Sequence, residues 1–538
     1  MSAIELPPRQ SAVKKWVGFA SLCAGMFMAV LDIQIVITSL TTIEEALKIG
    51  ADRMSWVQTA YLIAEVIAIP ITGLLTRVFT LRWLVTGAIT LFMLASIGCA
   101  ASNGFGELVA FRVLQGLAGG ALIPVVFSAI FLLFERGFEQ TLATTMGGII
   151  AVLAPAVGPL IGGVLTEYFS WHWLFLINVF PGILTMIAAA TCLPRDTPDP
   201  RLLKSLDWFS LGLIALALAA LEIGLKEAPD QGWLSPLVLS LHGLCAFCLY
   251  VAIRRPVPAV DFSLLRDRNL AFGCALSFIL GLGLFGSVYL LPVFLAYVRH
   301  HGPIDIGLIL LATGVAQLVA APVAVYLDRR FSARLLSSIG FGLFAVGLAM
   351  SGFETRESDF HELLWAQILR GGSVALCILP VTRFALGLLP LVRVSDASGL
   401  YNLSRNLGGA IGIALIDTVV FTRGAEHASR IGDLMKDQPE AAARLMRIGI
   451  DELPNPGDPL GILGVMDAIQ EASLTLAINE AWLILGGITA FALVLLWAMG
   501  PIRVPEGHWT NQSRVKFSIG VQFLGRTARK ILTHRETI

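Results

Sequence analysis

Long apolar runs recur along the whole chain and limit its possible folds more than any other feature. A helix needs roughly 20 apolar residues to cross about 30 Å of hydrocarbon. Because backbone N–H and C=O groups find no partners in lipid, such runs must be helices. The sequence therefore predicts an all-α integral membrane protein with fourteen transmembrane helices, at residues 16–40, 54–76, 82–101, 108–133, 141–165, 172–193, 207–225, 234–253, 270–298, 305–327, 334–353, 362–388, 397–421 and 476–499.

The composition excludes several other classes of protein. Only 14% of the residues are charged, against roughly 25% in soluble domains. Apolar side chains make up 56% of the chain, which excludes intrinsic disorder. The 38 Lys and Arg residues are matched by 38 Asp and Glu residues, so a nucleic-acid partner is not expected. The seven cysteines lie in apolar stretches without zinc-site spacing, and we expect neither a metal nor another cofactor.

The positions of Lys and Arg in the short loops predict the orientation in the membrane. With the amino terminus on the cytoplasmic side, the inner segments hold about seventeen of these residues and the short outer loops about five. The basic tail, residues 500–538, then also falls inside. We expect a multi-pass protein of the cytoplasmic (inner) membrane with both termini in the cytoplasm, which an even number of spans allows.

One polar segment, residues 422–475, is much longer than the other connections, and the predicted orientation places it outside. It contains two helix-compatible stretches, EAAARLMRIGI and GILGVMDAIQEASLTLAI, separated by the breaker run LPNPGDPLG. We interpret this segment as an extracytoplasmic loop between the last two spans.

Ionisable residues inside predicted spans are the first functional signal. An ionised side chain at the bilayer centre costs roughly 2.5–3.5 kcal/mol on insertion scales, so it usually faces a partner or a water-filled path. Asp32, Glu65 and Arg112 lie in the first, second and fourth spans, and we predict a proton-coupling cluster; a structural ion pair is the alternative. Asp417 has no evident partner in the sequence. Glu222 is interpreted as a charge near the outer mouth.

Glycine and proline are concentrated in the fifth span, which reads LAPAVGPLIGGVLTEYF. A GxxxG pair lets another helix backbone approach closely, and prolines remove helix hydrogen bonds and bend the segment. The pattern predicts a helix whose bend or contact surface matters for function. Its members are Pro155, Gly158, Pro159, Gly162 and Gly163.

Three of these motifs together resemble the fourteen-helix drug:proton antiporters of the EmrB/QacA type, within the major facilitator superfamily. LDIQIVITSL resembles the first-span acidic motif, with Asp32 at the acidic position. RVLQGLAGG resembles the fourth-span motif, with Arg112 and Gln115 at the matching positions. APAVGPLIGGVL resembles the fifth-span antiporter motif, the most specific of the three. The resemblance covers essentially the whole length.

The loop motif after the second span departs from the family pattern of Gly, three residues, Asp, a basic residue and Gly. Here GLLTRVFTLRW has an arginine at the Asp position and Thr80 at the second Gly. The equivalent loop of the second half, VYLDRRFSARLL, keeps an acidic residue beside two arginines. The candidate gate-loop residues are Gly73, Arg77, Asp328, Arg329 and Arg330.

The resemblance implies the major facilitator fold: two pseudo-symmetric six-helix bundles with two additional helices between them. The expected order is a cytoplasmic tail, an amino-terminal bundle, two central helices, five helices of the second bundle, the outer loop, the last helix and a basic tail. The boundaries are 1–15, 16–195, 196–260, 261–421, 422–475, 476–499 and 500–538.

The resemblance also implies a function, namely proton-coupled export of lipophilic drugs or toxic compounds by alternating access, without an enzymatic reaction. Relatives of the EmrB kind work with a periplasmic adaptor (EmrA-like) and an outer-membrane channel, so such partners are expected. A narrow-specificity exporter or importer of a metabolite or siderophore is the alternative, and a polytopic membrane enzyme or sensor is a further one. The candidate substrate-cavity residues are Tyr61, Gln115, Phe285, Tyr289, Gln317 and Asn402.

Overall fold

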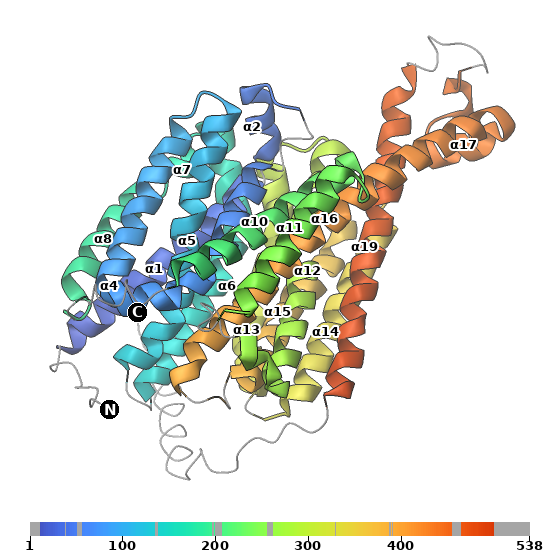
Figure 1. Cartoon of the computed structure of the whole chain (residues 1–538). Helices are drawn as coiled ribbons and strands as arrows, with labels where there is room; N and C mark the ends of the chain where they lie inside the picture. The colour runs from blue at the N-terminus through green and yellow to red at the C-terminus, as the bar shows by residue number, and fades with distance from the viewer. Residues whose placement is uncertain are drawn as a thin grey trace, which may run out of the picture. The chain divides into compact units, whose positions relative to one another are not determined.

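All regular secondary structure in the described part of the chain is helical (Figure 1). A computed structural model describes residues 11–37, 39–50, 56–134, 138–195, 198, 207–255, 262–328, 330–386, 389, 391–454 and 464–499.

The first half contains the helices α1 (Ala12–Ile37), α2 (Leu40–Leu47), α4 (Trp56–Ala100), α5 (Phe105–Leu133), α6 (Phe138–Tyr168), α7 (Trp173–Leu176) and α8 (Val179–Cys192). The predicted spans 54–76 and 82–101 are both parts of α4, which is broken at one residue. Thr80 has φ 68° and ψ 161° there, so the helix axis changes direction at this point.

The remaining helices are α10 (Trp208–Gln231), α11 (Pro236–Ile253), η1 (Phe262–Arg266), α12 (Arg268–Tyr297), α13 (Pro303–Asp328), α14 (Ala333–Met350), η2 (Ser351–Phe353), α15 (Phe360–Leu386), α16 (Leu391–Asp437), α17 (Pro439–Met446), η3 (Ile450–Glu452) and α19 (Met466–Ala498). Several begin at a side chain that caps the first turn. Asp207, Asp267 and Ser332 each accept a hydrogen bond from the backbone N–H three residues later, which satisfies a donor that the helix itself leaves unpaired.

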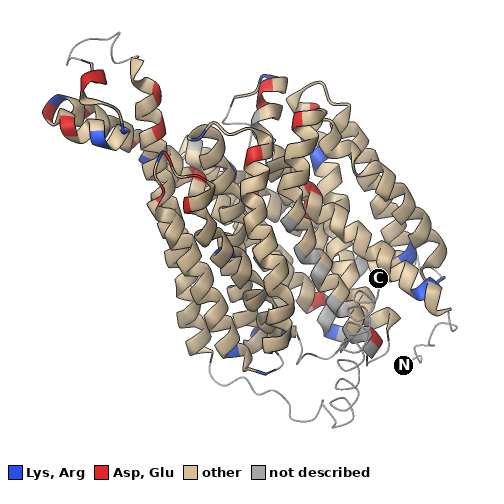
Figure 2. Cartoon of the chain, turned by 180° about the vertical axis from the view of Figure 1, so that it is seen from behind, with Lys and Arg blue, Asp and Glu red and all other residues tan. Residues whose placement is uncertain are grey.

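Twelve helices within the described residues are long and apolar enough to cross a membrane. The other two predicted spans correspond to the shorter apolar stretch Trp56–Ile69 and to the 31-residue helix α6. Charged residues are concentrated at the ends of the helices and around α17, and the middle of the helices carries few (Figure 2). This distribution is the one that a lipid environment requires, and the chain is a multi-pass membrane protein.

The helices pack as two groups with α10 and α11 beside them. In the first group α1 packs on α5, α6 and α8, and α4 packs on α5 and α8. In the second group α12 packs on α16 and α19, α14 packs on α15 and α19, and α13 packs on α15. The groups meet where α6 packs on α13 and α4 on α16, and α10 contacts both α4 and α16. We call the end of the bundle at α2 the outer end, after the predicted orientation.

The segment predicted as an outer loop is largely helical. The span expected to end at residue 421 continues without a break to Asp437, and the last helix begins at Met466, ten residues before the expected 476. A small core of its own, which includes Ile431, Met446 and Ile469, lies between α16, α17 and α19. The two long helices can therefore continue beyond lipid, and we call residues 422–454 with 464–475 the extension.

Candidate ion-coupling site

Glycines of α5 determine how closely α4 can approach it. A Cβ atom on Gly116 would lie 2.2 Å from the carbonyl oxygen of Tyr61, and one on Gly120 would lie 2.6 Å from that of Glu65. Real Cβ atoms do not approach backbone so closely, so α4 and α5 can be in contact only because these positions carry no side chain. The LQGLAGG sequence thereby brings Tyr61 and Glu65 next to the helix that carries Arg112.

Asp32 of α1 and Arg112 of α5 form an ion pair that is fully buried on both sides. Arg112 Nη1 donates a hydrogen bond to Asp32 Oδ2, and Arg112 Nε donates to the carbonyl oxygen of Val57, 2.9 Å away. The structure therefore brings together two of the three predicted coupling residues.

Two amide side chains complete the coordination of Asp32. Gln115 Nε2 and Asn178 Nδ2 each donate to Asp32 Oδ1 at 2.8 Å. Gln115 Oε1 in turn accepts from Arg112 Nη1 at 2.8 Å, and Gln115 Nε2 also donates to Ser96 Oγ at 2.9 Å. Asn178 lies between α7 and α8 and was missed from the sequence, where a single amide inside the apolar run LFLINVF was its only signal.

Aromatic rings cover the guanidinium group of Arg112. The ring of Tyr61 is centred 4.4 Å from Arg112 Cζ and that of Phe175 is 5.8 Å away, distances at which a cation is attracted to an aromatic face. The Tyr61 hydroxyl donates to the Ala29 carbonyl oxygen at 3.2 Å. Tyr61 and Gln115, predicted as substrate-cavity residues, therefore belong to the packing around the Asp32–Arg112 pair.

The pair is compensated in this arrangement and costly to break. Removing one partner of a buried ion pair costs about 3–5 kcal/mol, because the other charge is left without compensation. Arg112 Nη2 makes no hydrogen bond within the described part of the chain, so one donor remains open. Loss of the charge on Asp32 would remove the electrostatic attraction between Asp32 of α1 and Arg112 of α5.

Glu65 is buried in a different setting, with 2% of its surface exposed. The Asn406 side-chain amide of α16 is within hydrogen-bonding reach of its carboxyl group, whereas Oε2 has no partner among the described residues. Because α4 and α16 belong to different helix groups, Glu65 stands where the two groups meet. It is thus a carboxyl group with an oxygen open to a proton or to water.

The fifth-span motif lies where α6 contacts α1 and α13. A Cβ atom on Gly158 would lie 2.5 Å from Gln34 Cβ, and one on Gly163 would lie 2.4 Å from the Pro303 carbonyl oxygen. From the other side, a Cβ atom on Gly307 would lie 2.6 Å from the Pro159 carbonyl oxygen. The motif therefore allows contact between the two helix groups near the outer end.

The same motif has two further members, Gly162 and Pro155. The Gly162 carbonyl oxygen lies 3.5 Å from the Ser39 hydroxyl oxygen. The side chain of Pro155 lies outside the described part of the chain.

The gate loops are only partly described. Asp328 at the end of α13 pairs with Arg383 of α15 at 3.1 Å, whereas Arg330 lies over the ring of Tyr326 at 4.5 Å. The partner of the acidic residue thus comes from α15, which the loop motif alone did not suggest. The surroundings of Gly73, the side chain of Arg77 and all of Arg329 lie outside the described residues.

The other predicted cavity residues are not brought to a common surface by any contact described. Phe285 of α12 packs against Gly409 of α16, and Asn402 donates to the Ser398 carbonyl oxygen at 2.9 Å. Tyr289 and Gln317 are buried. Their role in a substrate cavity stays a prediction.

A pocket lies instead between α4, α10 and α16, and it changes the interpretation of two residues. Glu222, interpreted as a charge near the outer mouth, is only 2% exposed. Asp417, for which no partner was evident, lies 3.7 Å from Lys226. The pocket is lined by Thr59, Leu62, Glu222, Lys226, Ala410, Ile413, Ala414 and Asp417. Sequence reasoning missed Lys226 because it lies past the predicted end of its span.

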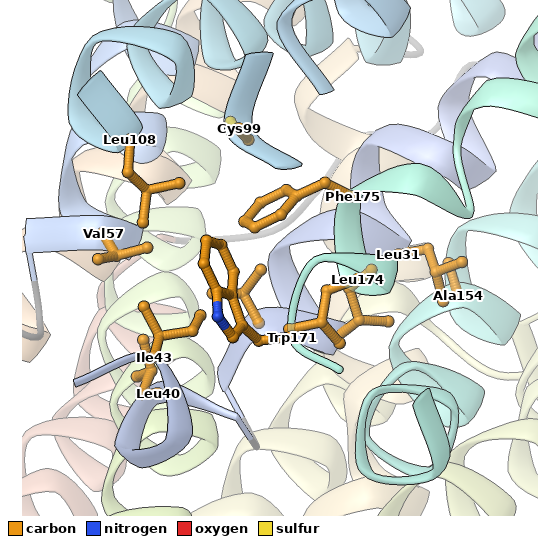
Figure 3. Packing of buried hydrophobic residues seen from close by; sticks show 12 residues of the cluster. Leu31, Leu40, Ile43, Val57, Cys99, Leu108, Ala154, Trp171, Leu174 and Phe175 are labelled. Atoms are coloured by element: carbon orange, nitrogen blue, oxygen red, sulfur yellow. The ribbon is translucent and has the colours of Figure 1, made fainter. Parts of the chain in front are cut away.

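An apolar cluster extends from α2, at the outer end, to Phe175, whose ring is centred 5.8 Å from Arg112 Cζ. It includes Leu40 and Ile43 of α2, Leu108 of α5 and Trp171 before α7. Figure 3 shows the Trp171 ring and the Phe175 ring turned toward each other between these helices, and their planes are nearly perpendicular at 87°. Such close-packed apolar side chains leave water no polar partners along this route.

Comparison with known proteins gives a consistent assignment. The family model described as Major Facilitator Superfamily matches residues 22–413. The chain is 37% identical over 442 residues to the colistin resistance protein EmrB of Acinetobacter baumannii, covering 81% of this chain and 86% of that protein. It is 27% identical over 493 residues to the multidrug export protein EmrB of Escherichia coli K12, covering 89% and 94%.

The fold is also similar to a solved structure. A mutant of the nucleoside transporter NupG matches with a TM-score of 0.55 and 13% identity, over 90% of this chain and 100% of that one. At this identity the likeness concerns the fold alone, and it agrees with the two helix groups described above. The chain belongs to the Major Facilitator Superfamily.

Proposed function

We propose that this protein exports lipophilic compounds across the cytoplasmic membrane in exchange for protons. The observation that carries the proposal is the pair of buried carboxyl groups in neighbouring helices: Asp32, compensated by Arg112, and Glu65, with one oxygen open. Charged groups are kept in the membrane interior at a cost when they bind a substrate or carry ions. The names of the relatives refer to multidrug export and colistin resistance. They support drugs as the substrates and export as the direction of transport.

In the proposed cycle the two helix groups rock about the contacts between α6 and α13 and between α4 and α16. A proton from outside neutralises Glu65, and its release inside restores the charge. Asp32 and Arg112 respond through the same helix pair, because α5 packs closely on α4 at Gly116 and Gly120. Each proton that moves inward contributes about 2.3 kcal/mol per 100 mV of membrane potential.

The orientation and the partner form part of the proposal. Both termini are placed in the cytoplasm, so that the extension lies in the periplasm of a Gram-negative cell. Its own apolar core supports a folded surface rather than a flexible connection. We propose the extension as the contact for an EmrA-like adaptor, which would pass the substrate to an outer-membrane channel.

The direct test is ethidium transport by everted vesicles that hold the Asp32→Asn or the Glu65→Gln variant. Both variants should insert normally and lose ethidium transport driven by a pH gradient. The matched control is Glu107→Gln, which changes an acidic residue in the first turn of α5, outside the buried network. Full gradient-driven transport by the Asp32 variant would remove this residue from the coupling role.

The alternative of a narrow-specificity exporter or importer of a metabolite or siderophore is distinguished by substrate range. A resistance and accumulation profile over several unrelated compounds, measured in a host without its own pumps, should show protection against more than one lipophilic compound. Protection against none, together with uptake of one metabolite, would favour the alternative.

A further inference from the structure

The helix α10 carries charged residues into the membrane where both helix groups meet. It packs on α11, on α4 of the first group and on α16 of the second. Glu222 and Lys226 are one turn apart on this helix and therefore lie on the same face. Both are buried, with 2% and 7% of their surfaces exposed, and both line the pocket between α4, α10 and α16.

Glu222 is the unusual member of this pair. Neither of its carboxyl oxygens has a hydrogen-bond partner within the described residues. A buried carboxyl group without a partner is costly, by about 1–3 kcal/mol or more, unless water reaches it or it takes up a proton. Lys226, which would be the nearest cation on the same helix, lies 3.7 Å from Asp417 of α16.

The polar groups at the contact between α4, α10 and α16, which we call the seam, are arranged in order of depth from the outer end toward Glu65. Asp417 and Lys226 lie nearest the outer end, Glu222 lies one helical turn deeper, and Glu65 is close enough for electrostatic interaction with Glu222. Asn406, which faces Glu65, precedes Asp417 by about three turns of α16, or roughly 16 Å along the axis. Among the described residues of α11, the titratable groups beside α10 include His242, Cys245 and Cys248, and the two cysteines pack in a cluster with Ala217 and Ala220 of α10.

His242 lies on the other side of α10 from the pocket. Its ring faces Gly224, two residues and about 200° of helical rotation from Glu222. His242 Nδ1 is 2.8 Å from the Val238 carbonyl oxygen of its own helix. The groups that face Glu222 are therefore Lys226, Glu65 and Asp417.

The size of the pocket decides what it can hold. Its volume of about 20 Å³ is enough for about one water molecule and far below the roughly 300–1,000 Å³ of sites for drug-sized ligands. Water beside an unpartnered carboxyl group can pass a proton onward, whereas a lipophilic substrate would not fit. The apolar cluster of Figure 3 fills the other approach, from α2 at the outer end to Phe175 beside Arg112.

We propose that Glu222 relays protons from the outer mouth at Lys226 and Asp417 to Glu65, along the seam between α4, α10 and α16. The Glu222 carboxylate takes a proton from a hydronium ion or water on the outer side and passes it, through water, to the Glu65 carboxylate. No other bond is made or broken. This proposal rests on the proposed proton-coupled function, and it gives the additional helix α10 a part in the coupling.

The test compares Glu222→Gln with wild type in proteoliposomes, with ethidium as the transported probe. Gradient-driven ethidium transport should fall about a hundredfold or more, because a positioned acid–base group contributes roughly 10²–10⁴-fold to a proton transfer. Ethidium binding and the exchange of labelled ethidium without a gradient should be unchanged. A small membrane-permeant acid such as azide should restore part of the rate in Glu222→Gln, because it can carry the proton past the missing carboxyl group.

Three variants control the experiment. Glu227→Gln removes a carboxyl group of the same helix that is hydrogen-bonded to Gln231, and it should transport like wild type. Glu222→Asp keeps the acid and should retain most of the rate. If Glu222→Gln fails to fold, Asp417→Asn tests the outer end of the same route and should slow gradient-driven transport with the same azide rescue.

The outcomes separate the relay from the proposed function. A wild-type protein whose ethidium transport ignores the pH gradient would overturn the proposed function itself. Proton-coupled wild type with an unchanged Glu222→Gln variant would overturn only the relay. Loss of ethidium binding and of gradient-free exchange in that variant, without azide rescue, would likewise contradict the relay, because it would assign Glu222 a substrate or packing role.

Discussion

Thr80, in the middle of α4, is held in a backbone conformation that suits glycine. Its φ of 68° and ψ of 161° fall in a region that is essentially confined to glycine, and a β-branched residue with positive φ is a clear outlier. The side chain is 8% exposed, and Oγ1 has no hydrogen-bond partner in the described residues. We therefore predict that Thr80→Gly stabilises the protein.

The expected magnitude follows from three contributions. Relief of the backbone strain should contribute about 1–3 kcal/mol, and removal of the unpaired buried hydroxyl about 1–3 kcal/mol. The greater freedom of glycine in the unfolded chain costs about 0.5–1 kcal/mol. The net gain should be about 3 kcal/mol, which is a large change for one residue.

The measurement is thermal unfolding of the purified protein in detergent, followed by intrinsic fluorescence, with Thr80→Ala as the matched control. Alanine removes the hydroxyl group but keeps the Cβ atom that causes the strain. The predicted order of Tm is Gly highest, then Ala, then Thr. An alanine variant as stable as the glycine variant would show that the hydroxyl group, and not the backbone, carries the cost. A glycine variant less stable than wild type would refute the reasoning.

Three further changes test other parts of the structure. Arg112→Lys should lower transport at least about tenfold, because one ammonium group cannot replace hydrogen bonds to both Val57 and Asp32, each worth about 1.5–3 kcal/mol; wild-type turnover in the vesicle assay would contradict this. Gly163→Ala should open the α6–α13 contact and raise thiol labelling of a Ser39→Cys reporter. Gly148→Ala, whose added Cβ atom meets no described neighbour within 4 Å, should not. Arg255 donates hydrogen bonds to Asp207 and holds the pKa of the Asp207 carboxyl group below its ordinary value of 3.8. The pair therefore stabilises the protein at pH values above 3.8. This stabilisation is lost as the pH falls through the lowered pKa. Asp207→Asn should therefore lower the Tm near neutral pH, and this loss should shrink steadily as the pH falls below 3.8. A loss that does not depend on pH over this range would contradict the pairing.

The helical architecture followed from the sequence because lipid leaves few choices. Apolar runs of about 20 residues must form helices, and the assignment of the chain to the superfamily is confirmed. Helix ends were harder to predict. The extension of α16 to Asp437 is polar, and nothing in a hydropathy pattern separates a polar loop from a polar helix outside the membrane.

The site was predictable where a charge stands alone in an apolar span. Asp32 and Arg112 meet as predicted, since two opposite charges in lipid each need compensation. Asn178 completes that site, but it comes from another part of the chain. Only the packed structure shows that its side chain points toward Asp32. Glu222 was assigned to the outer mouth because it lies near the end of its predicted span. The distance from a span end does not show which face of the helix a residue occupies, and Glu222 is on a buried face.

The most direct test of the account is transport by the purified protein in proteoliposomes with a pH gradient and the membrane potential held at zero. Ethidium should accumulate against its own gradient, up to about tenfold per pH unit for each proton exchanged, since one pH unit is about 1.36 kcal/mol per proton. Protons should move in the opposite direction at the same time. Ethidium movement that stops at equal concentrations, with no proton flux linked to it, would contradict proton-coupled export.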